Sequence, residues 1–338
     1  MKKDQRKYKV CVVGVGAVGI ELLRILRQRQ FPMEKLTVLA QSARSIEVDG
    51  IRYDIQAISP EAFEKDQIVL FAGTEGEKGA AVTYAKEARR RGAICIDNGA
   101  DFRMEPDVPL VVPEVNPEDV KHHKGFIANP NCSTIQMVMA LAPLHRSFGI
   151  RKVVVSTYQA ASGAGQQAMQ VLQAETSGLL KKEEIPPPQV LPQRIGFNAI
   201  PQIGPFQDSG YTSEEWKMVR ETQKILHDPK LKITPTAVRI PVMNAHSESI
   251  YVEMECPVRP EEAKKAWKTM PGLVVVEETD RYPMPIDADG RDEVCVGRIR
   301  PDPFDPHALV FWVVSDNLRK GAALNAVQIA ELLVKGEK

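Results

Sequence analysis

The sequence predicts an α/β protein whose N-terminal half forms a doubly wound parallel sheet. One observation is the segment "YKVCVVGVGAVGIELLRILRQRQF" (8–31), in which an apolar strand, a glycine-rich turn and an amphipathic helix follow one another directly. A second is that strand-like and helix-like segments continue to alternate as far as "NPNCST" (129–134), a pattern typical of parallel sheets covered by helices. A third is that "RKVVVSTY", "SIYVEMEC" and "HALVFWVVS" fit a separate mixed sheet in the second half.

Composition excludes several classes of protein. The 338 residues suit two domains, and 44 Lys plus Arg balance 44 Asp plus Glu, so no basic surface indicates a nucleic-acid partner. The basic start "MKKDQRKYKV" leads straight into a strand without a signal-peptide core, and no apolar run reaches membrane-spanning length. The five cysteines are odd in number and lack CxxC pairs, which predicts neither disulfides nor a metal site. We therefore expect a cytoplasmic protein.

The first glycine-rich turn has the spacing GxGxxG, formed by Gly14, Gly16 and Gly19. In a Rossmann-type fold these glycines allow a tight turn, close approach of a pyrophosphate, and packing of the helix on the strand. The amide groups at the helix start, at Ala17 and Val18, would face the phosphates with the positive end of the helix dipole. The turn therefore predicts a dinucleotide site.

The next strand-like segment, "KLTVLAQSARS" (35–45), indicates which dinucleotide binds. An NAD site commonly ends this strand with an acid for the ribose hydroxyls, whereas here Arg44 is flanked by Ser42 and Ser45. A guanidinium and two hydroxyls suit a 2′-phosphate, so the sequence favours NADP. The alternative interpretation is an arginine that is merely exposed.

Further elements follow in order along the first half. The segments "DQIVLFAG", "AICIDNG", "LVVPEVN" and "GFIANPN" are predicted strands, and "GEKGAAVTYAKEARRRG" is a predicted helix closed by Gly92. Ligands of such sheets bind at the carboxyl ends of the strands. Because "DNGADFR" and "NPNCST" lie at such ends, Arg103 and Cys132 are expected near the cofactor.

Cys132 begins a predicted helix, "IQMVMALAPLHRSFG", behind Pro130. A thiolate at a helix N-terminus is stabilised by the dipole and by free amide donors. The alternative, a small buried apolar residue, suits the strand-like surroundings of Cys11, Cys95, Cys256 and Cys295 but not those of Cys132. The sequence therefore favours a nucleophile.

A thiol nucleophile needs a base, and histidine is the usual one near neutral pH. His246 stands in a polar "NAHSES" turn just before a strand whose apolar residues alternate with polar ones. The other five histidines lie in a polar loop, at helix ends or beside proline. From spacing alone, a structural role for His246 is as well supported as a catalytic one.

Five ordered motifs resemble the aspartate-semialdehyde dehydrogenase family: "DFRM…LVVPEVN", "NPNCSTIQM", "VSTYQAASGAG", "IPVMNAHSES" and "DNLRKGAALNAVQIAELL". The match spans nearly the whole chain. It implies reduction of 4-phospho-L-aspartate by NADPH to L-aspartate 4-semialdehyde and phosphate, en route to lysine, methionine and threonine. It also implies a homodimer. The implied mechanism is similar to that of glyceraldehyde-3-phosphate dehydrogenase, in which a cysteine forms a thioester, a histidine acts as the base and a hydride is transferred.

The resemblance implies a role for each matched residue. Cys132 would be the thioester nucleophile, His246 the general acid/base that protonates the oxyanion as an imidazolium, and Gln159 the residue that orients the thioester. The substrate-binding residues would be Arg239 for the carboxylate, Glu214 for the ammonium, and Arg103 with Lys217, assisted by Asn131, for the phosphate. The cofactor pocket would include Ser162, Gly163 and, at the nicotinamide, Asn317. Without the resemblance, Glu214 and Lys217 would be interpreted as a surface ion pair that follows a capping box of Thr212 and Glu215.

The chain departs from the family pattern in two places. "GVGAVG" is one residue shorter than the usual glycine turn, and "DNGADFR" places Asp101 beside Arg103, where it would either weaken phosphate binding or face away. The resemblance implies an NADP-binding domain of residues 1–133 and 317–338, to which the C-terminal helix returns. Residues 134–316 would form an α+β substrate-binding and dimerisation domain, in which the proline-rich "EIPPPQVLPQ" is an ordered excursion.

Two other functions remain open at this stage. N-acetyl-gamma-glutamyl-phosphate reductase shares the fold and the Cys/His chemistry, but it usually has "GCY" where this chain has "NCST". A catalytically silent NADP-binding paralogue would need none of Cys132, Gln159, Arg239 and His246, yet all four are present.

Overall fold

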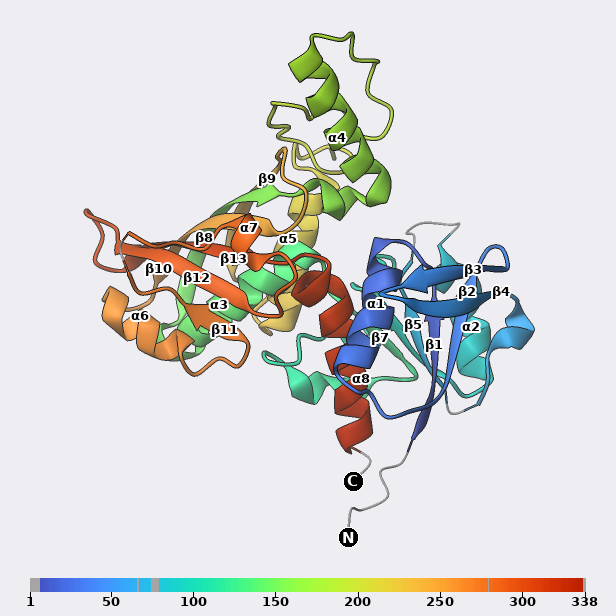
Figure 1. The fold of residues 1–338 in the computed structure, drawn as a ribbon. Helices are drawn as coiled ribbons and strands as arrows, with labels where there is room; N and C mark the ends of the chain where they lie inside the picture. Colours follow the sequence, from blue (N-terminus) through green and yellow to red (C-terminus); the bar gives the residue numbers. More distant parts are fainter. Residues whose placement is uncertain (1–6, 66, 74–78, 279, 337–338) are drawn as a thin grey trace. The chain divides into compact units, whose positions relative to one another are not determined.

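The computed structural model describes residues 7–65, 67–73, 79–278 and 280–336. The basic residues 1–6, Asp66 of one predicted strand and residues 76–78 of one predicted helix lie outside this part. The chain divides into two compact units, residues 1–130 with 322–338, and residues 131–321. Each unit is described separately, and Figure 1 shows the elements of both.

The first unit contains a seven-stranded sheet in the order β3-β4-β2-β1-β5-β6-β7. The neighbours from β4 to β7 are parallel, and only the edge strand β3 is antiparallel to its neighbour. The strands are β1 (Tyr8–Val13), β2 (Met33–Ala40), β3 (Arg44–Val48), β4 (Ile51–Ala57), β5 (Gln67–Phe71), β6 (Ile94–Asp97) and β7 (Phe126–Ala128). The helices are α1 (Ala17–Gln28), α2 (Ala80–Arg90) and α8 (Leu324–Gly336), with short 3₁₀ turns η1 (Pro60–Ala62) and η2 (Pro117–His122).

Helices cover both faces of this sheet. Val10 and Val12 of β1 join one buried cluster with residues of α1 and α8, which lie side by side in Figure 1. Cys11 lies between them in the strand and points to the opposite face, because side chains alternate along a strand. The buried alanines of α2 do not belong to the cluster of α1 and α8. The doubly wound sheet and the return of the C-terminal helix to the first unit are thereby confirmed.

The glycine-rich turn has the close contacts that its sequence predicts. Gly14 has φ +99°, a backbone conformation that favours glycine. A Cβ on Gly19 would lie 2.0 Å from the carbonyl oxygen of Gly14, so helix α1 approaches the end of β1 as only glycine allows. The shortened turn therefore keeps the functions of the first and third glycines of the motif.

Two details of the first unit differ from the sequence prediction. The predicted strand "LVVPEVN" forms only an isolated bridge, from Leu110 to Ala128, because the Asn116 side chain bonds the backbone of Leu110 and Val112 and closes a turn. The β3–β4 hairpin was not predicted. Its signal was the dipeptide Asp49-Gly50, in which both residues have positive φ, as a tight hairpin turn requires.

The second unit contains a mixed six-stranded sheet in the order β11-β12-β13-β10-β8-β9. Its strands are β8 (Ile150–Gln159), β9 (Lys232–Arg239), β10 (His246–Met254), β11 (Leu273–Val275), β12 (Val294–Pro301) and β13 (Ala308–Ser315). Its helices are α3 (Cys132–Phe148), α4 (Gln166–Lys181), α5 (Ser213–Ile225), α6 (Pro260–Trp267) and α7 (Pro285–Ala288), with a 3₁₀ turn η3 (Ala161–Ala164). A π-helical turn, η4 (Arg319–Ala323), spans the junction before α8. The predicted mixed sheet and the fold class are confirmed.

Helix α3 is the centre of the second unit. Every residue from Ser133 to Leu144 is buried, and the helix packs against strands β8, β10, β12 and β13 and against helices α5 and α6. The indole of Trp267 on α6 donates to the carbonyl of Ala140 at 2.7 Å, which fixes α6 on α3. The first residue of this buried helix is Cys132, so the core of the unit holds the thiol in place.

The proline-rich segment after α4 is ordered. Leu191 and Ile195 pack into a small cluster with Leu172 of α4, and the Glu175 carboxylate accepts the backbone N–H groups of Ile195 and Gly196, each at 2.8 Å. The excursion is therefore part of the folded unit. Within the described residues, no helix is both long and apolar enough to cross a bilayer.

Candidate active site

The thiol of Cys132 lies at a capped helix N-terminus. Asn131 is the N-cap of α3, and its Oδ1 accepts the backbone N–H groups of Ser133 at 3.0 Å and Thr134 at 3.3 Å. The first turn carries no acidic residue, and Cys132 is half-buried, whereas the residues after it are fully buried. The sequence-predicted nucleophile is thus accessible at the positive end of the helix dipole.

His246 is the first residue of β10 and is fully buried. Its Nδ1 accepts the backbone N–H of Ala160 at 3.1 Å, so in the neutral ring the proton is on Nε2. Burial, and next the nearby Arg239 guanidinium, lower the pKa of His246 well below its ordinary value. The imidazole is therefore neutral near neutral pH, and Nε2–H finds no hydrogen-bond partner among the described residues.

Arg239 and His246 approach the same backbone atom. A Cβ on Gly163 would lie 2.8 Å from Arg239 Nη1 and 2.9 Å from His246 Nε2, so both groups reach the site loop only because residue 163 has no side chain. Arg239 is buried and donates to the carbonyl of Ala160 at 2.7 Å. Burial lowers the pKa of Arg239 from its ordinary value, and the nearby Glu214 and then Cys132 oppose this lowering in part. The guanidinium, the imidazole and the thiol therefore belong to one site.

The Glu214 carboxylate joins several of the predicted substrate-binding residues. It accepts from Asn131 Nδ2 at 3.0 Å and from Gln159 Nε2 at 3.2 Å, and it lies 4.0 Å from Lys217 Nζ. Its place on α5 follows from the predicted capping box, which is confirmed by the bonds between Thr212 and Glu215. Glu214 thus orients both the cap of the thiol helix and the glutamine of the site.

A polar ring fixes the loop before His246. The Ser162 hydroxyl donates to Asn244 Oδ1 at 2.8 Å, and Asn317 Oδ1 lies 3.0 Å from the same Ser162 Oγ. Asn317 Oδ1 also accepts the N–H of Ala245, whose φ of +69° is unusual for a residue with a side chain. This bond holds the strained residue directly before the imidazole.

Gly321 contacts the thiol residue. A Cβ on Gly321 would lie 2.9 Å from Cys132 Cβ and 3.5 Å from Asn317 Cβ. The second unit therefore gathers ten sequence-predicted site residues: Asn131, Cys132, Gln159, Ser162, Gly163, Glu214, Lys217, Arg239, His246 and Asn317.

Arg103 belongs to the first unit. It is buried, and its guanidinium donates to the carbonyls of Asn129 at 2.9 Å and Asn98 at 2.7 Å, at the carboxyl ends of β7 and β6. Asp101, which the family pattern lacks at this position, is exposed. The backbone thus fixes the direction of the Arg103 side chain.

The predicted cofactor residues of the first unit lie at the ends of β1 and β2. The glycine turn leads to helix α1, which begins at Ala17, so the amides of Ala17 and Val18 lie in its first turn. Arg44 is exposed and donates to Ser42 Oγ at 3.1 Å, whereas Ser45 bonds Asp54 and Arg52 across the β3–β4 hairpin. Arg44 begins β3 and does not end β2, which ends at Ala40.

The other cysteines separate into two groups. Cys11, Cys95 and Cys295 are buried in strands, and burial raises the pKa of Cys95 to about 12. Cys256 was also expected in a strand, but β10 ends at Met254 and Cys256 is exposed. This thiol must be removed when the reactivity of Cys132 is measured.

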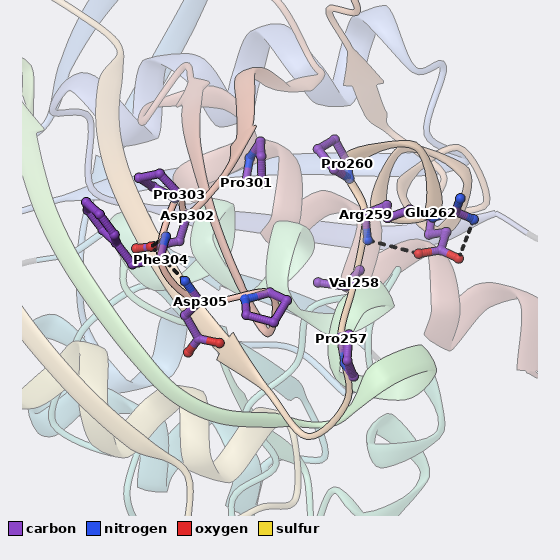
Figure 2. Close-up of a pocket in the computed structure, with 11 residues that line it drawn as sticks. Pro257, Val258, Arg259, Pro260, Glu262, Pro301, Asp302, Pro303, Phe304 and Asp305 are labelled. Atoms are coloured by element: carbon purple, nitrogen blue, oxygen red, sulfur yellow. Dashed lines mark hydrogen bonds and ion pairs between the residues drawn. The ribbon is translucent and has the colours of Figure 1, made fainter.

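Two other features lie apart from these side chains. A cavity of about 640 Å³, shown in Figure 2, is lined by no predicted site residue and is surrounded by five prolines: Pro257, Pro260, Pro301, Pro303 and Pro306.

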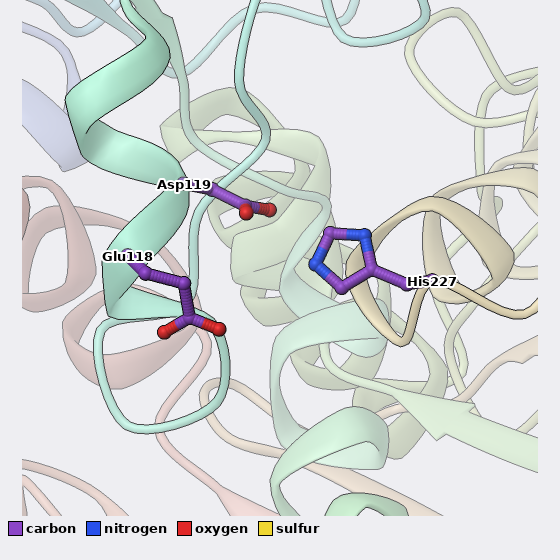
Figure 3. Close-up of side chains that lie close together, drawn as sticks. All are labelled: Glu118, Asp119 and His227. Carbon is purple, nitrogen blue, oxygen red and sulfur yellow. The ribbon is translucent and has the colours of Figure 1, made fainter.

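Figure 3 shows Glu118 and Asp119 on η2 of the first unit and His227 after α5 of the second. Asp119 accepts from Asn116 Nδ2 at 2.7 Å, and we assign these three residues no metal-binding role.

Comparison with known proteins identifies the family. A model described as "Semialdehyde dehydrogenase, NAD binding domain" matches residues 9–123, and one described as "Semialdehyde dehydrogenase, dimerisation domain" matches residues 141–320. The aspartate-semialdehyde dehydrogenase of Aquifex aeolicus is 51% identical over 339 residues, covering 97% of this chain and 98% of the relative. The chain belongs to the aspartate-semialdehyde dehydrogenase family. The resemblance found in the sequence motifs is thereby confirmed.

Solved structures of the family agree with this assignment. Aspartate-semialdehyde dehydrogenase II of Vibrio cholerae has a TM-score of 0.92 and 41% identity, covering 98% of this chain and 99% of the other, and a structure of the same protein "complexed with ASA" matches equally well. A Candida albicans aspartate-semialdehyde dehydrogenase "with NADP" has a TM-score of 0.70 and 25% identity, covering 97% and 98%. The Bacillus subtilis aspartate-semialdehyde dehydrogenase is 47% identical over 98% of both chains.

Sequence reasoning missed several residues that shape the site. Glu221 accepts the Asn131 backbone N–H at 2.7 Å, and its signal was its position seven residues after Glu214, two turns along the same helix. Asn244 and Gly321 adjoin predicted motifs but carry no pattern of their own. Their contacts depend on strands and loops that are distant in sequence.

Proposed function

We propose that the chain is an enzyme that reduces 4-phospho-L-aspartate with NADPH to L-aspartate 4-semialdehyde and phosphate, in the synthesis of lysine, methionine and threonine. The observation that carries this proposal is the grouping of a half-buried thiol at a helix N-terminus with a buried arginine, a buried histidine and Gln159 in one unit. Family membership supports it, since the relatives carry the name of this enzyme.

Cys132 would act as the nucleophile. Its thiolate attacks the acyl carbon of the aspartyl phosphate, the carbon–oxygen bond to phosphate breaks, and a thioester and inorganic phosphate result. Arg103 and Lys217 would stabilise the departing phosphate, and Asn131 would assist through the amide that also contacts Glu214. The positive end of the helix dipole at the start of α3 favours the ionised sulfur.

A bound nicotinamide dinucleotide would supply the hydride that reduces the thioester carbon. The resulting oxyanion lies where His246 Nε2–H donates a hydrogen bond, and Gln159 orients the same carbonyl. When the oxyanion collapses, the carbon–sulfur bond breaks, the aldehyde forms and the thiolate returns. No proton is consumed between hydride transfer and release of the aldehyde, so a neutral His246 suffices as a donor in these steps. The one proton that the overall reduction takes up goes to the departing phosphate. This differs from the imidazolium acid that the resemblance implies.

Arg239 would bind the substrate carboxylate, because a guanidinium fork matches two carboxylate oxygens. Its buried position, next to His246, would place the carboxylate close to the reacting carbon. Glu214 would bind the substrate ammonium with the carboxylate that already orients Asn131 and Gln159. A substrate bearing both charges is thus favoured over one with an acetylated nitrogen.

The glycine turn fits a dinucleotide. A Cβ built on Gly16, directly before α1, would meet nothing within 4 Å, so a pyrophosphate could approach the turn there, and the amides of Ala17 and Val18 would bind it. Arg44 and Ser42 would hold a 2′-phosphate, while Ser45 is already bonded to Asp54. Ser162, Gly163 and Asn317 would complete the nicotinamide end of the pocket.

We also propose residues 1–133 with 317–338 as the NADP-binding domain and residues 134–316 as the substrate-binding and dimerisation domain of a cytoplasmic homodimer. The face of the second sheet that carries Val154, Tyr158 and Trp312 supports a dimer. Val154 is 37% exposed, and the rings of Tyr158 and Trp312 lie 5.3 Å apart beside a cavity of about 480 Å³. The opposite face packs against α3.

The proposal is tested by assaying aspartate semialdehyde oxidation with NADP in the presence and absence of phosphate. We expect NADPH formation that depends on phosphate, because phosphate must cleave the thioester. Activity only on N-acetylglutamate semialdehyde would instead support the acetylated-substrate reductase. NADP binding without turnover on either aldehyde would identify a silent paralogue.

Arg44→Ala is expected to lower the NADP-to-NAD ratio of kcat/KM by about 10-fold to 100-fold, the value of one or two charge-assisted hydrogen bonds. Initial rates with each cofactor measure the ratio. Arg52→Ala is the matched control, because Arg52 lies on the same hairpin and bonds Ser45 and Asp54. An unchanged ratio in Arg44→Ala would refute the assignment of the 2′-phosphate site.

A further inference from the structure

Glu248 is a buried carboxyl that the proposed chemistry does not use. It lies on β10 two residues after His246, so both side chains point to the same face of the strand. Its side chain is fully buried, and neither carboxyl oxygen has a hydrogen-bond partner of normal geometry among the described residues. Its partners across the sheet are Thr157 and Val313, which carry no charge.

Gln136 is the matching residue on helix α3. It lies four residues after Cys132, on the same face of the helix and one turn deeper. Gln136 is also buried, and both atoms of its amide lack a partner of normal geometry in the described structure. Helix α3 packs on β10, and the Gln136 amide lies close enough to Glu248 to act on its pKa.

The chemistry of the pair depends on the protonation of Glu248. An ionised carboxylate buried without a cation costs several kcal/mol, and such a group becomes neutral instead. Burial raises the pKa of Glu248 well above its ordinary value, and the Gln136 amide opposes this only in part. A neutral carboxylic acid has one donor and one acceptor, which match the carbonyl and NH₂ of a glutamine amide.

We propose that Glu248 is held as a neutral carboxylic acid and pairs with Gln136, and that this pair positions helix α3 on strand β10 so that Cys132 faces His246. The proposal gives Glu248 no contact with substrate or cofactor, so its role is that of a positioning residue. Its effect on turnover rests on the proposed function, whereas its protonation and its effect on the thiol do not.

The experiment compares Glu248→Gln, Glu248→Leu and the double variant Glu248→Leu/Gln136→Leu, all with Cys256→Ser so that the exposed thiol is removed. Infrared spectroscopy at neutral pH measures the carbonyl band of a protonated carboxyl. Alkylation by iodoacetamide measures the reactivity of Cys132, and steady-state kinetics measure kcat and KM. Thermal unfolding reports the stability of each variant.

We expect the infrared band in the parent protein and in Glu175→Gln, the matched control that changes another buried carboxyl, but not in the Glu248 variants. Glu248→Gln should keep parental kcat and alkylation rate, because an amide can pair with Gln136. The double variant should fold as stably as the parent, since two apolar groups replace both partners. It should nonetheless lose about 10-fold to 100-fold in kcat, with KM unchanged, because the thiol is displaced.

Three results would overturn the proposal: no band that depends on Glu248, a Glu248→Gln variant as slow as Glu248→Leu, or a double variant with parental kcat and alkylation rate. If Glu248→Leu fails to fold, the double variant still decides the matter. If the chain fails to oxidise aspartate semialdehyde, the infrared and alkylation results test the proposal independently of the proposed function.

Discussion

Cys132→Ser is expected to lower kcat by at least about 10⁴-fold, because the serine hydroxyl does not ionise at this helix N-terminus and cannot replace the thiolate. The N-cap bonds of Asn131 come from another residue, and serine is smaller than cysteine, so the fold should be retained. Initial rates of phosphate-dependent semialdehyde oxidation measure the loss, and thermal unfolding confirms that the variant is folded.

Cys256→Ser is the control, since it removes the exposed thiol and should leave kcat unchanged. Intact-mass spectrometry adds a direct readout. The wild-type protein mixed with aspartyl phosphate and no NADPH should gain one aspartyl group, which Cys132→Ser should not. Retention of even a few per cent of the wild-type rate in Cys132→Ser would contradict covalent catalysis by this residue.

The second large effect concerns His246. His246→Asn is expected to lower kcat by about 10²-fold to 10⁴-fold, the range for losing one well-placed donor or acid/base group. The asparagine oxygen can still accept the Ala160 N–H, but no group remains at the position of Nε2. His246→Gln, whose amide nitrogen reaches that position, should retain more activity. Steady-state kinetics test whether kcat falls further in His246→Asn than in His246→Gln, and His122→Asn, a substitution of an exposed histidine, is the control.

The pH profile distinguishes a neutral donor from an imidazolium acid. Because the pKa of His246 is lowered well below 6.5, the neutral Nε2–H form is present throughout the range above that lowered pKa and is lost only as the pH falls through it. We therefore expect the pH profile of kcat in the wild type to show no fall on the alkaline side of 6.5. An activity that declines as the pH rises through 6.5, and whose decline is absent in His246→Gln, would show that the imidazolium is required.

Sequence predicted the sheet, the thiol and the motif residues because each has a local signal. The glycine turn, the capping box at Thr212 and the strand at 150–159 follow from spacing within a few residues. The edge hairpin was missed although Asp49-Gly50 marks it, and the strand predicted at 110–116 was wrong because the Asn116 side chain competes for the backbone.

The site beyond those motifs depends on contacts between distant segments. The lowered pKa of His246 follows from its burial and next from the nearby Arg239 guanidinium, and its tautomer is fixed by the Ala160 N–H, 86 residues away in sequence. Likewise, nothing near Glu248 in the chain indicates that it meets Gln136, because the meeting depends on the packing of α3 against β10. Periodicity identifies the face of an element but not its partner.

The thiol is attached to the most enclosed helix of its unit, since every residue from Ser133 to Leu144 is buried. Such a helix cannot open by itself, so its amide protons should exchange with deuterium only when the whole unit unfolds. The geometry around the sulfur is then as durable as the core. Thermal inactivation should coincide with the cooperative melting of the unit and should not precede it.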